Sequence, residues 1–259
     1  MTDKPRVLVT QPEPGRLAAA LTARGADVWS VPTIRIAPPD DWRLADAALG
    51  AWTSFDWAIF TSGNAVRAVR ARMEALGMRP SALPQPRIAA VGAATAGAVD
   101  RVGWRVHGVP ERYTGEALAL ALSEGGGLAG ARVFVPRGDL ARDLVPGALR
   151  AAGADVVEVT VYRTVPAEFD AAAVREALVG ATVAAVTFMS PSAAMYFVRA
   201  LGRDIWKKML ARVLVASIGP TTSAGLRKLG RPPDIEAPEA TAETLADAVV
   251  AALEERARR

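Results

Sequence analysis

The chain lacks cysteine altogether and contains a single histidine, His107. Without cysteine there can be no disulfide, no thiolate metal ligand and no cysteine nucleophile, and this composition suits a reducing compartment. We therefore expect a cytoplasmic protein. His107 falls within an expected strand, so we expect it to have a structural role rather than to belong to a Ser–His–Asp arrangement.

Long apolar runs and nucleotide-binding motifs are also missing. No stretch approaches the roughly 20 apolar residues of a membrane helix, and MTDKPRVLVT has no signal-peptide core. TQPEPG is not the dinucleotide-binding fingerprint, and no phosphate-loop motif occurs. Aromatic residues make up 6%, and the one basic cluster is the terminal ERARR. We therefore expect no cofactor, no metal, no nucleic acid and no membrane.

What the chain does contain is an internal repeat. Residues 6–31 and 132–159 both read as an apolar strand, a polar turn, a helix and then Gly-Ala-Asp-Val. Further on, FDWAIFTSGNAVRAV matches VAAVTFMSPSAAMYFV, and RIAAVGAATAGAVDRVG matches RVLVASIGPTTSAGLRKLG. Gly25 and Gly153 lie 128 residues apart, as do Phe60 and Phe188, and Gly92 and Gly219 lie 127 apart. Each half of the chain therefore holds one copy of a single plan.

That plan is an alternation of short strands and helices. Runs rich in Val and Ile, typical of strands buried in a parallel sheet, occupy 6–10, 28–31, 56–61, 87–91, 105–108, 132–136, 156–160, 183–188, 213–217 and 234–237. Glycines that can end a helix in the left-handed conformation follow the helical stretches at Gly25, Gly77, Gly103, Gly153, Gly202 and Gly230. The pattern predicts two α/β domains with right-handed crossovers.

Two extended stretches, 32–39 and 161–166, follow the second strand of each copy. We expect them to be linkers. Since the copies are equivalent, the first strand–helix–strand unit of each copy could pair with either half of the chain. The residues alone leave both pairings open.

Small polar turns follow the strands, just ahead of the helices. They are TQPEPGR, TSGNAV, GAATAG, PRGDLAR, SPSAAM and GPTTSAG. Ligands of open parallel sheets bind beyond the carboxyl ends of the strands, and amides at helix starts attract anions. Each turn alone is also explained as a helix cap. Three turns per copy, facing across a cleft, would suit a large ligand with many dispersed negative charges, with Arg16, Arg137 and Arg142 as charged donors.

Taken together, these segments resemble the uroporphyrinogen-III synthase family. The resemblance is carried by TSGNAVRA, VGAATAGAV, VPRGDLARDLVPGALRAAGADVVEVTVYRT, FMSPSAAMYF and ASIGPTTSAGL, with PEATAETL downstream. It extends from Val7 to about Val250, and GPTT and VYRT are its most specific parts. It implies two flavodoxin-like α/β domains with parallel sheets, joined by a two-stranded linker. One domain would comprise residues 1–35 plus 165–259, and the other residues 36–164.

The resemblance also implies a reaction. A uroporphyrinogen-III synthase is a cofactor-independent hydro-lyase that cyclises hydroxymethylbilane, a linear tetrapyrrole with eight carboxylates, to uroporphyrinogen III. Water is lost, and the terminal (D) pyrrole ring is inverted through a spiro intermediate. The enzyme would be a cytoplasmic monomer of haem and related tetrapyrrole biosynthesis, in transient contact with hydroxymethylbilane synthase.

Carried onto this chain, the resemblance gives two catalytic candidates, Tyr162 in VYRT and Thr222 in GPTT. Tyr162 would donate a proton as the substrate hydroxyl leaves, and its alternative role is packing at the linker. The substrate-binding candidates are Gln11, Arg16, Ser62, Gly63, Asn64, Gly92, Ala93, Thr95, Arg137, Gly138, Ser190, Ser192, Gly219 and Thr221.

Two positions depart from the commonest family pattern. Gln11 replaces a frequent Arg, and Met189 replaces a frequent Thr or Ser. These departures hint at one alternative, an inactive regulatory homologue. The other alternative is a two-domain binding protein for an anionic ligand.

Overall fold

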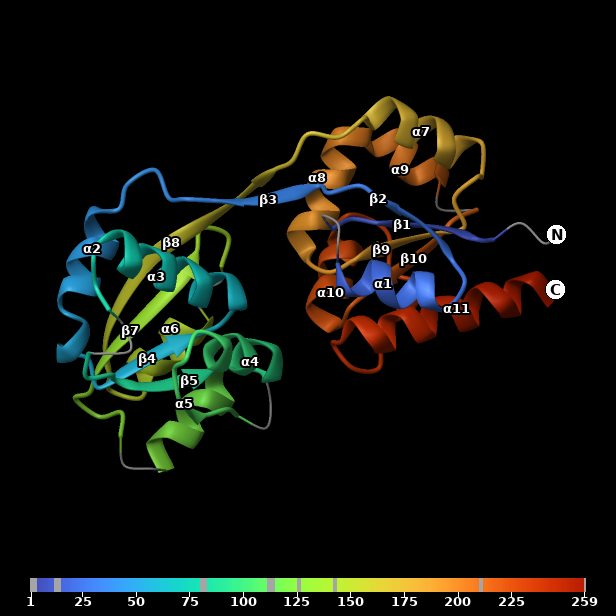
Figure 1. Cartoon of the computed structure of the whole chain (residues 1–259). Helices are drawn as coiled ribbons and strands as arrows, with labels where there is room; N and C mark the ends of the chain where they lie inside the picture. The colour runs from blue at the N-terminus through green and yellow to red at the C-terminus, as the bar shows by residue number, and fades with distance from the viewer. Residues whose placement is uncertain are drawn as a thin grey trace. The chain divides into compact units, whose positions relative to one another are not determined.

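The computed structural model describes residues 4–11, 15–79, 83–110, 115–124, 127–141, 144–209 and 212–258. The chain divides into two compact units. Unit 1 comprises Met1–Arg35 and Val165–Arg259, and unit 2 comprises Ile36–Thr164. Each unit is a parallel sheet with helices on both faces (Figure 1).

Unit 1 contains a five-stranded sheet in the order β11-β10-β9-β1-β2. Its strands are β1 (Arg6–Val9), β2 (Asp27–Ser30), β9 (Ala185–Phe188), β10 (Leu214–Ser217) and β11 (Ile235–Glu236). Its helices are α1 (Arg16–Ala23), α7 (Ala171–Val179), α8 (Pro191–Leu201), α9 (Arg203–Met209), α10 (Pro220–Lys228) and α11 (Ala242–Arg258). All neighbouring strands are parallel. In chain order the sheet reads 2-1-3-4-5, which is the flavodoxin-like order.

Unit 2 contains a six-stranded sheet in the order β3-β8-β7-β4-β5-β6. Its strands are β3 (Ile34–Ala37), β4 (Trp57–Phe60), β5 (Arg87–Ala90), β6 (Val106–Gly108), β7 (Arg132–Gly138) and β8 (Asp155–Pro166). Its helices are α2 (Arg43–Gly50), the short 3-10 helix η1 (Trp52–Ser54), α3 (Gly63–Ala75), α4 (Ala93–Arg101), α5 (Gly115–Glu124) and α6 (Leu144–Ala151). From β8 to β6 the strands are parallel and repeat the order of unit 1.

The strand pairing shows which halves of the repeat associate. The segment β1-α1-β2 comes from the first copy and pairs through β1 with β9 of the second copy. Conversely, β7-α6-β8 comes from the second copy and pairs through β7 with β4 of the first. Each unit is therefore built from both copies.

Alternate residues of the central strands face opposite helix layers. In β4, Phe60 packs in a core with α2, α3 and α4, whereas Ile59 packs in a core with α5 and α6. In β1, Leu8 faces the layer of α7 to α10, and Val7 faces α1 and α11. All four side chains are fully buried. Such strands are covered on both faces, which explains their continuous Val- and Ile-rich sequences.

The predicted α/β class with parallel sheets is confirmed. All six glycines predicted to end helices have φ angles between 71° and 89°. The observed strands differ most from prediction at β8, which runs unbroken from Asp155 to Pro166 instead of ending at residue 160. β3 and β8 are neighbours in the sheet, and both strands cross the boundary between the units.

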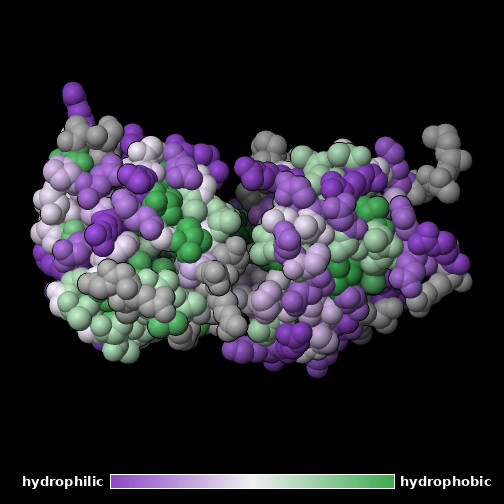
Figure 2. Space-filling model, turned by 90° about the horizontal axis from the view of Figure 1, so that it is seen from below, coloured by the Kyte–Doolittle hydropathy of each residue, from purple (hydrophilic) through white to green (hydrophobic). Residues whose placement is uncertain are grey.

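The surface carries few large apolar side chains. On the face shown in Figure 2, apolar residues form separated patches among polar ones. Exposed apolar residues such as Leu44, Leu120 and Val179 come from three different helices. Scattered residues of this kind need no functional explanation. Among the residues described, no helix combines the length and apolar character that crossing a membrane requires.

Candidate functional site

The predicted site residues fall into two groups, one in each unit. Because the strands of each sheet are parallel, the turns after their carboxyl ends lie along one edge. The group in unit 1 follows β1, β9 and β10 and consists of Gln11, Arg16, Ser190, Ser192, Gly219, Thr221 and Thr222. The group in unit 2 lies at the ends of β4, β5 and β7 and in β8, and consists of Ser62, Gly63, Asn64, Gly92, Ala93, Thr95, Arg137, Gly138 and Tyr162.

Serines begin α3 and α8 in the same way. The Oγ of Ser62 accepts a hydrogen bond from the Ala65 amide, and that of Ser190 from the Ala193 amide, each at 3.2 Å. Both serines have extended backbone, as N-cap residues do. The remaining amides of a first turn have no partners within the helix, so each helix start favours an anion.

Glycines begin α4 and α10. Gly92 has a φ angle of 101°, in the region that disfavours any side chain. Gly219 is extended, a conformation open to any residue. Both glycines are buried, whereas the residues that follow them, Ala93 and Pro220, are exposed. Solvent therefore reaches the first turn of each helix.

The threonines of these turns differ in exposure. Thr95 and Thr222 are 6% and 2% exposed. Thr221, next to Thr222 in GPTT, is exposed. Within unit 1, Thr221 therefore presents its side chain to solvent, while the Thr222 side chain packs inside the unit.

Tyr162 has the most specific surroundings. Its hydroxyl oxygen lies 3.2 Å from the Oγ of Ser62. Its ring lies so close to Gly138 that a Cβ atom added there would be 2.6 Å from the ring Cζ. Tyr162 also borders a mainly apolar hollow of about 320 Å³ formed by α3, β3, β8 and Trp42. A proton-bearing hydroxyl, a helix N-terminus and an apolar surface therefore meet in unit 2.

An irregularity in β8 directs Tyr162 to this place. Arg137 pairs with Thr160, but the next residue, Gly138, pairs with Tyr162, so that Val161 is passed over. As a result Val161 and Tyr162 both pack against the core of α2, α3 and α4, although neighbours in a regular strand face opposite sides. Our reading of the sequence missed this feature. A signal was present in the sequence. Apolar residues alternate regularly at Val157, Val159 and Val161, and the next large apolar side chain, Tyr162, follows at once instead of two positions later.

The two predicted arginines in the described ranges have different environments. The Arg137 guanidinium forms an ion pair with Glu158 and donates a hydrogen bond to the Ala141 carbonyl oxygen. Glu158 also pairs with Arg150 at 3.1 Å. Arg16, in contrast, is exposed at the first turn of α1. Unit 1 therefore presents the Arg16 guanidinium to solvent, whereas unit 2 holds the Arg137 guanidinium in an ion-pair network.

The remaining predictions concern polar side chains beside the helix starts. The Oδ1 of Asn64 accepts a hydrogen bond from Arg67, and Ser192 lies 3.0 Å from Ser190, Oγ to Oγ. Gln11 is half-buried after β1, and Met189 packs against the core of α1 and α11. Arg142 lies outside the described residues.

His107 accepts a hydrogen bond at Nδ1 from the Ile88 amide, at 3.1 Å, which links β6 to β5.

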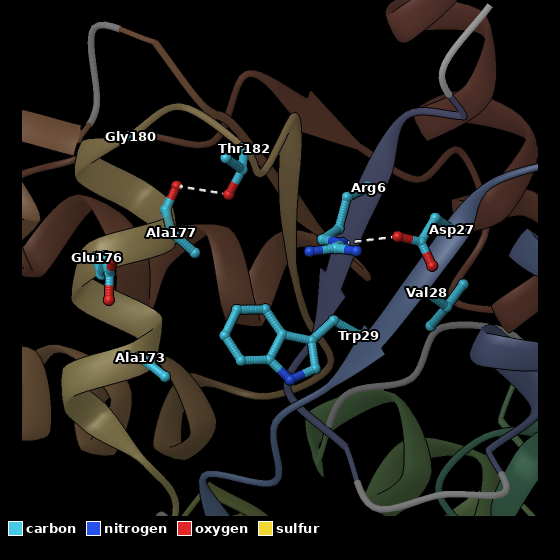
Figure 3. Close-up of a pocket in the computed structure, with 9 residues that line it drawn as sticks. All are labelled: Arg6, Asp27, Val28, Trp29, Ala173, Glu176, Ala177, Gly180 and Thr182. Atoms are coloured by element: carbon cyan, nitrogen blue, oxygen red, sulfur yellow. Dashed lines mark hydrogen bonds and ion pairs between the residues drawn. The ribbon is translucent and has the colours of Figure 1, made fainter. Parts of the chain in front are cut away.

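A separate hollow of about 560 Å³ lies toward the amino ends of β1 and β2 in unit 1 (Figure 3). There the Trp29 ring stands between α7 and the ion pair of Arg6 and Asp27, whose nitrogen and oxygen are 2.6 Å apart. The residues that line it include none of those predicted for the site. It belongs to the opposite end of the sheet from the polar turns.

Two flavodoxin-like units, each with helix N-termini gathered at the carboxyl edge of its sheet, define a duplicated two-domain α/β protein. The family model described as "Uroporphyrinogen-III synthase HemD" matches residues 15–247. This chain therefore belongs to the uroporphyrinogen-III synthase family, as the sequence motifs predict.

Individual relatives agree with this assignment. The chain is 33% identical over 246 residues to the uroporphyrinogen-III synthase of Synechococcus elongatus, covering 93% of this chain and 90% of the relative. It is 29% identical over 233 residues to that of Chlorobaculum parvum, covering 88% and 91%. A crystal structure of a mutant uroporphyrinogen III synthase from Thermus thermophilus superposes with a TM-score of 0.67 at 20% identity, covering 97% of this chain and 99% of that one. The last comparison establishes the shared fold.

Proposed function

We propose that this chain converts hydroxymethylbilane to uroporphyrinogen III as a cofactor-independent hydro-lyase. The substrate is a linear tetrapyrrole with eight carboxylates, and the product is the macrocycle in which the terminal (D) ring is inverted through a spiro intermediate. Family membership supports the proposal. The observation that supports it most is the position of Tyr162, whose hydroxyl lies beside the N-terminus of α3.

The carboxylates require hydrogen-bond donors. The first turns of α3 and α4 in unit 2, and of α8 and α10 in unit 1, offer backbone amides with the positive end of the helix dipole. Arg16 adds an exposed guanidinium. Backbone amides need no particular side chain, so Gln11 and Met189 leave this part of the site intact.

The chemistry begins with loss of the substrate hydroxyl. The bond from carbon to the hydroxyl oxygen breaks as the pyrrole nitrogen supplies an electron pair and an azafulvene forms. The departing oxygen takes a proton from Tyr162 and leaves as water. Ring closure through the spiro intermediate ends when the new macrocycle releases a proton, which balances the one given by Tyr162. No electron is gained or lost, so the reaction needs no redox cofactor.

The test is a coupled assay in which hydroxymethylbilane synthase supplies the substrate and chromatography separates the type III from the type I product. We expect mainly type III product. If the chain only binds the substrate, or is an inactive homologue, the type I isomer will form at the spontaneous rate with or without it, and the proposal is then wrong.

We also propose that units 1 and 2 are the two domains of a cytoplasmic monomer, with the boundaries 1–35 plus 165–259 and 36–164. The absence of cysteine fits a reducing compartment. Contact with hydroxymethylbilane synthase would be transient. Light scattering coupled to size-exclusion chromatography should give the mass of a single chain for this protein. In a mixture with hydroxymethylbilane synthase, the two proteins should elute separately. A stable dimer or a stable complex would contradict this part of the proposal.

A further inference from the structure

We propose that Gly138 and Ser62 are positioning residues for Tyr162. In this arrangement Gly138 supplies the flat surface on which the tyrosine ring lies, and Ser62 fixes the phenol oxygen. The inference rests on the proposed function, in which Tyr162 donates a proton. Neither residue needs to touch the substrate in order to act in this way.

Glycine is needed at position 138 because of the close Tyr162 ring, not because of the backbone conformation. Its φ angle is not among the positive values that favour glycine. A Cβ atom built on Gly138 would instead lie 2.6, 2.7 and 2.8 Å from the Cζ, Cε2 and Oη atoms of Tyr162. Such distances are far below van der Waals contact. Because the crowded atoms are at the far end of a side chain, a larger residue would move the ring and leave the sheet in place.

The main chain of Tyr162 is held independently of its ring. The Asp139 amide donates a hydrogen bond to the Tyr162 carbonyl oxygen at 3.2 Å. The Asp139 carboxylate in turn accepts one from the Thr164 amide at 2.9 Å. These bonds fix the main chain from Tyr162 to Thr164, and the position of the hydroxyl therefore depends on the side-chain torsions. Gly138 and Ser62 are placed to set those torsions.

Ser62 is also able to donate the hydrogen bond to Tyr162. Its Oγ already accepts a hydrogen bond from the Ala65 amide at 3.2 Å, which leaves its own hydrogen free to donate. The Tyr162 oxygen, 3.2 Å away, can accept that hydrogen, and either hydroxyl can be the donor of the pair. With Ser62 as donor, the phenol hydrogen remains available to the substrate.

The first experiment compares two Gly→Ala substitutions in unit 2. Gly138→Ala should fold and lower kcat by roughly 10-fold, because a misplaced donor loses much of its contribution. KM should change little, since the helix amides remain in place. The matched control is Gly50→Ala at the end of α2, where an added Cβ meets nothing within 4 Å. This control should retain the wild-type kcat.

The second experiment makes Gly138→Ala and Ser62→Ala, each in the wild-type chain and in a Tyr162→Phe background. There Gly138→Ala and Ser62→Ala should each change kcat by less than about twofold, because no hydroxyl remains to be misplaced. Loss of the α3 cap should lower stability in both backgrounds, so unfolding curves separate that effect from the rate. A further large loss of kcat in either double variant would show that Gly138 or Ser62 acts on the substrate or the fold, and would overturn the proposal.

The outcomes also separate this inference from the proposed function. If the wild-type chain forms no type III product, the proposed function itself fails. If the wild-type chain is active and Gly138→Ala keeps full kcat with a stable fold, only the positioning role is wrong.

Discussion

The two units place a serine at the same point of the repeat but give it different neighbours. Ser190 lies 128 residues after Ser62, and both cap a helix with the same geometry. Ser62 meets the hydroxyl of Tyr162, whereas Ser190 meets Ser192. In unit 1 the position equivalent to Tyr162 is Ile34, which packs against the core of that unit. Among the described residues, the duplicated helix start therefore meets a tyrosine hydroxyl in unit 2 and a serine hydroxyl in unit 1.

A second difference concerns the contact between the helices at these edges. In unit 2 a Cβ atom added to Gly63 on α3 would lie 3.3 Å from the Cβ of Ala98 on α4. In unit 1 the glycine is on the other helix, and a Cβ added to Gly225 on α10 would lie 2.8 Å from the Cβ of Pro191 on α8. Close packing thus requires one small partner at this contact, and either helix can supply it.

The largest effect should come from removing the donor that distinguishes the units. Tyr162→Phe is expected to lower kcat by roughly 10-fold or more, because a positioned proton donor is lost while water partly replaces it. The product should remain mainly type III, because ring inversion depends on the shape of the site. Steady-state assays with product analysis measure both.

The control removes the same atom from the other unit. Tyr196→Phe, on α8, should retain the wild-type rate. Full activity of Tyr162→Phe at saturating substrate would make Tyr162 a packing residue, and the two units would then be chemically alike.

The helix contact can be tested by adding one methyl group to each unit. Gly225→Ala should lower the free energy of unfolding by about 1–3 kcal/mol more than Gly63→Ala, because only the Cβ at Gly225 would overlap its neighbour severely. Urea unfolding followed by circular dichroism measures the difference. Equal stability of the two variants would mean that both contacts relax equally well.

The arginines allow a comparison of substrate binding. Arg16→Gln should raise KM by about 2–5-fold, since an exposed ion pair contributes little more than this. Arg137→Gln should change KM less and stability more, because Arg137 is paired with Glu158. The wild-type KM should also rise with salt, and Arg16→Gln should weaken that rise. A KM that is flat from low to high salt would indicate that pyrrole contacts dominate binding.

The smallest effect concerns acid stability. Hydrogen bonds from Arg72 hold the pKa of Asp46 in unit 2 below its ordinary value, and hydrogen bonds from Arg24 do the same to the pKa of Asp247 in unit 1. Each carboxylate therefore contributes stability above its unfolded pKa, near 3.9, and that contribution is lost as the pH falls through the lower folded value.

Asn substitutions measure these contributions. Asp46→Asn should cost more at pH 7 than Asp247→Asn, because the Asp46 side chain is 31% exposed and that of Asp247 is 65% exposed. Both costs should shrink below about pH 4. Thermal unfolding at neutral and acid pH tests this, and a cost that does not depend on pH would mean that the ion pairs are not responsible.

Local features of the fold could be predicted because they are determined by nearby residues. Helix ends follow from glycines such as Gly25 and Gly153, and strands follow from apolar runs covered on both faces. The neighbours of Tyr162 could not be predicted, because they depend on a skipped residue in β8 and on Ser62, 100 positions away. Nor does sequence pattern reveal that Arg137 is engaged by Glu158, since both residues would also suit a solvated surface.

The glycine at the helix contact is Gly63 on α3 in unit 2 but Gly225 on α10 in unit 1. This difference limits the order in which the two facing residues of a duplicated contact can change. Changing one arrangement into the other a residue at a time passes through either a glycine facing a glycine or an alanine facing a proline. The first leaves a small void that costs about 1 kcal/mol. The second forces Cβ atoms to about the 2.8 Å found for the Gly225 position. In either direction the tolerated path therefore passes through the glycine pair. An α10 helix in place of α4 would therefore be tolerated, whereas an α8 helix in place of α3 would set Pro191 against Ala98.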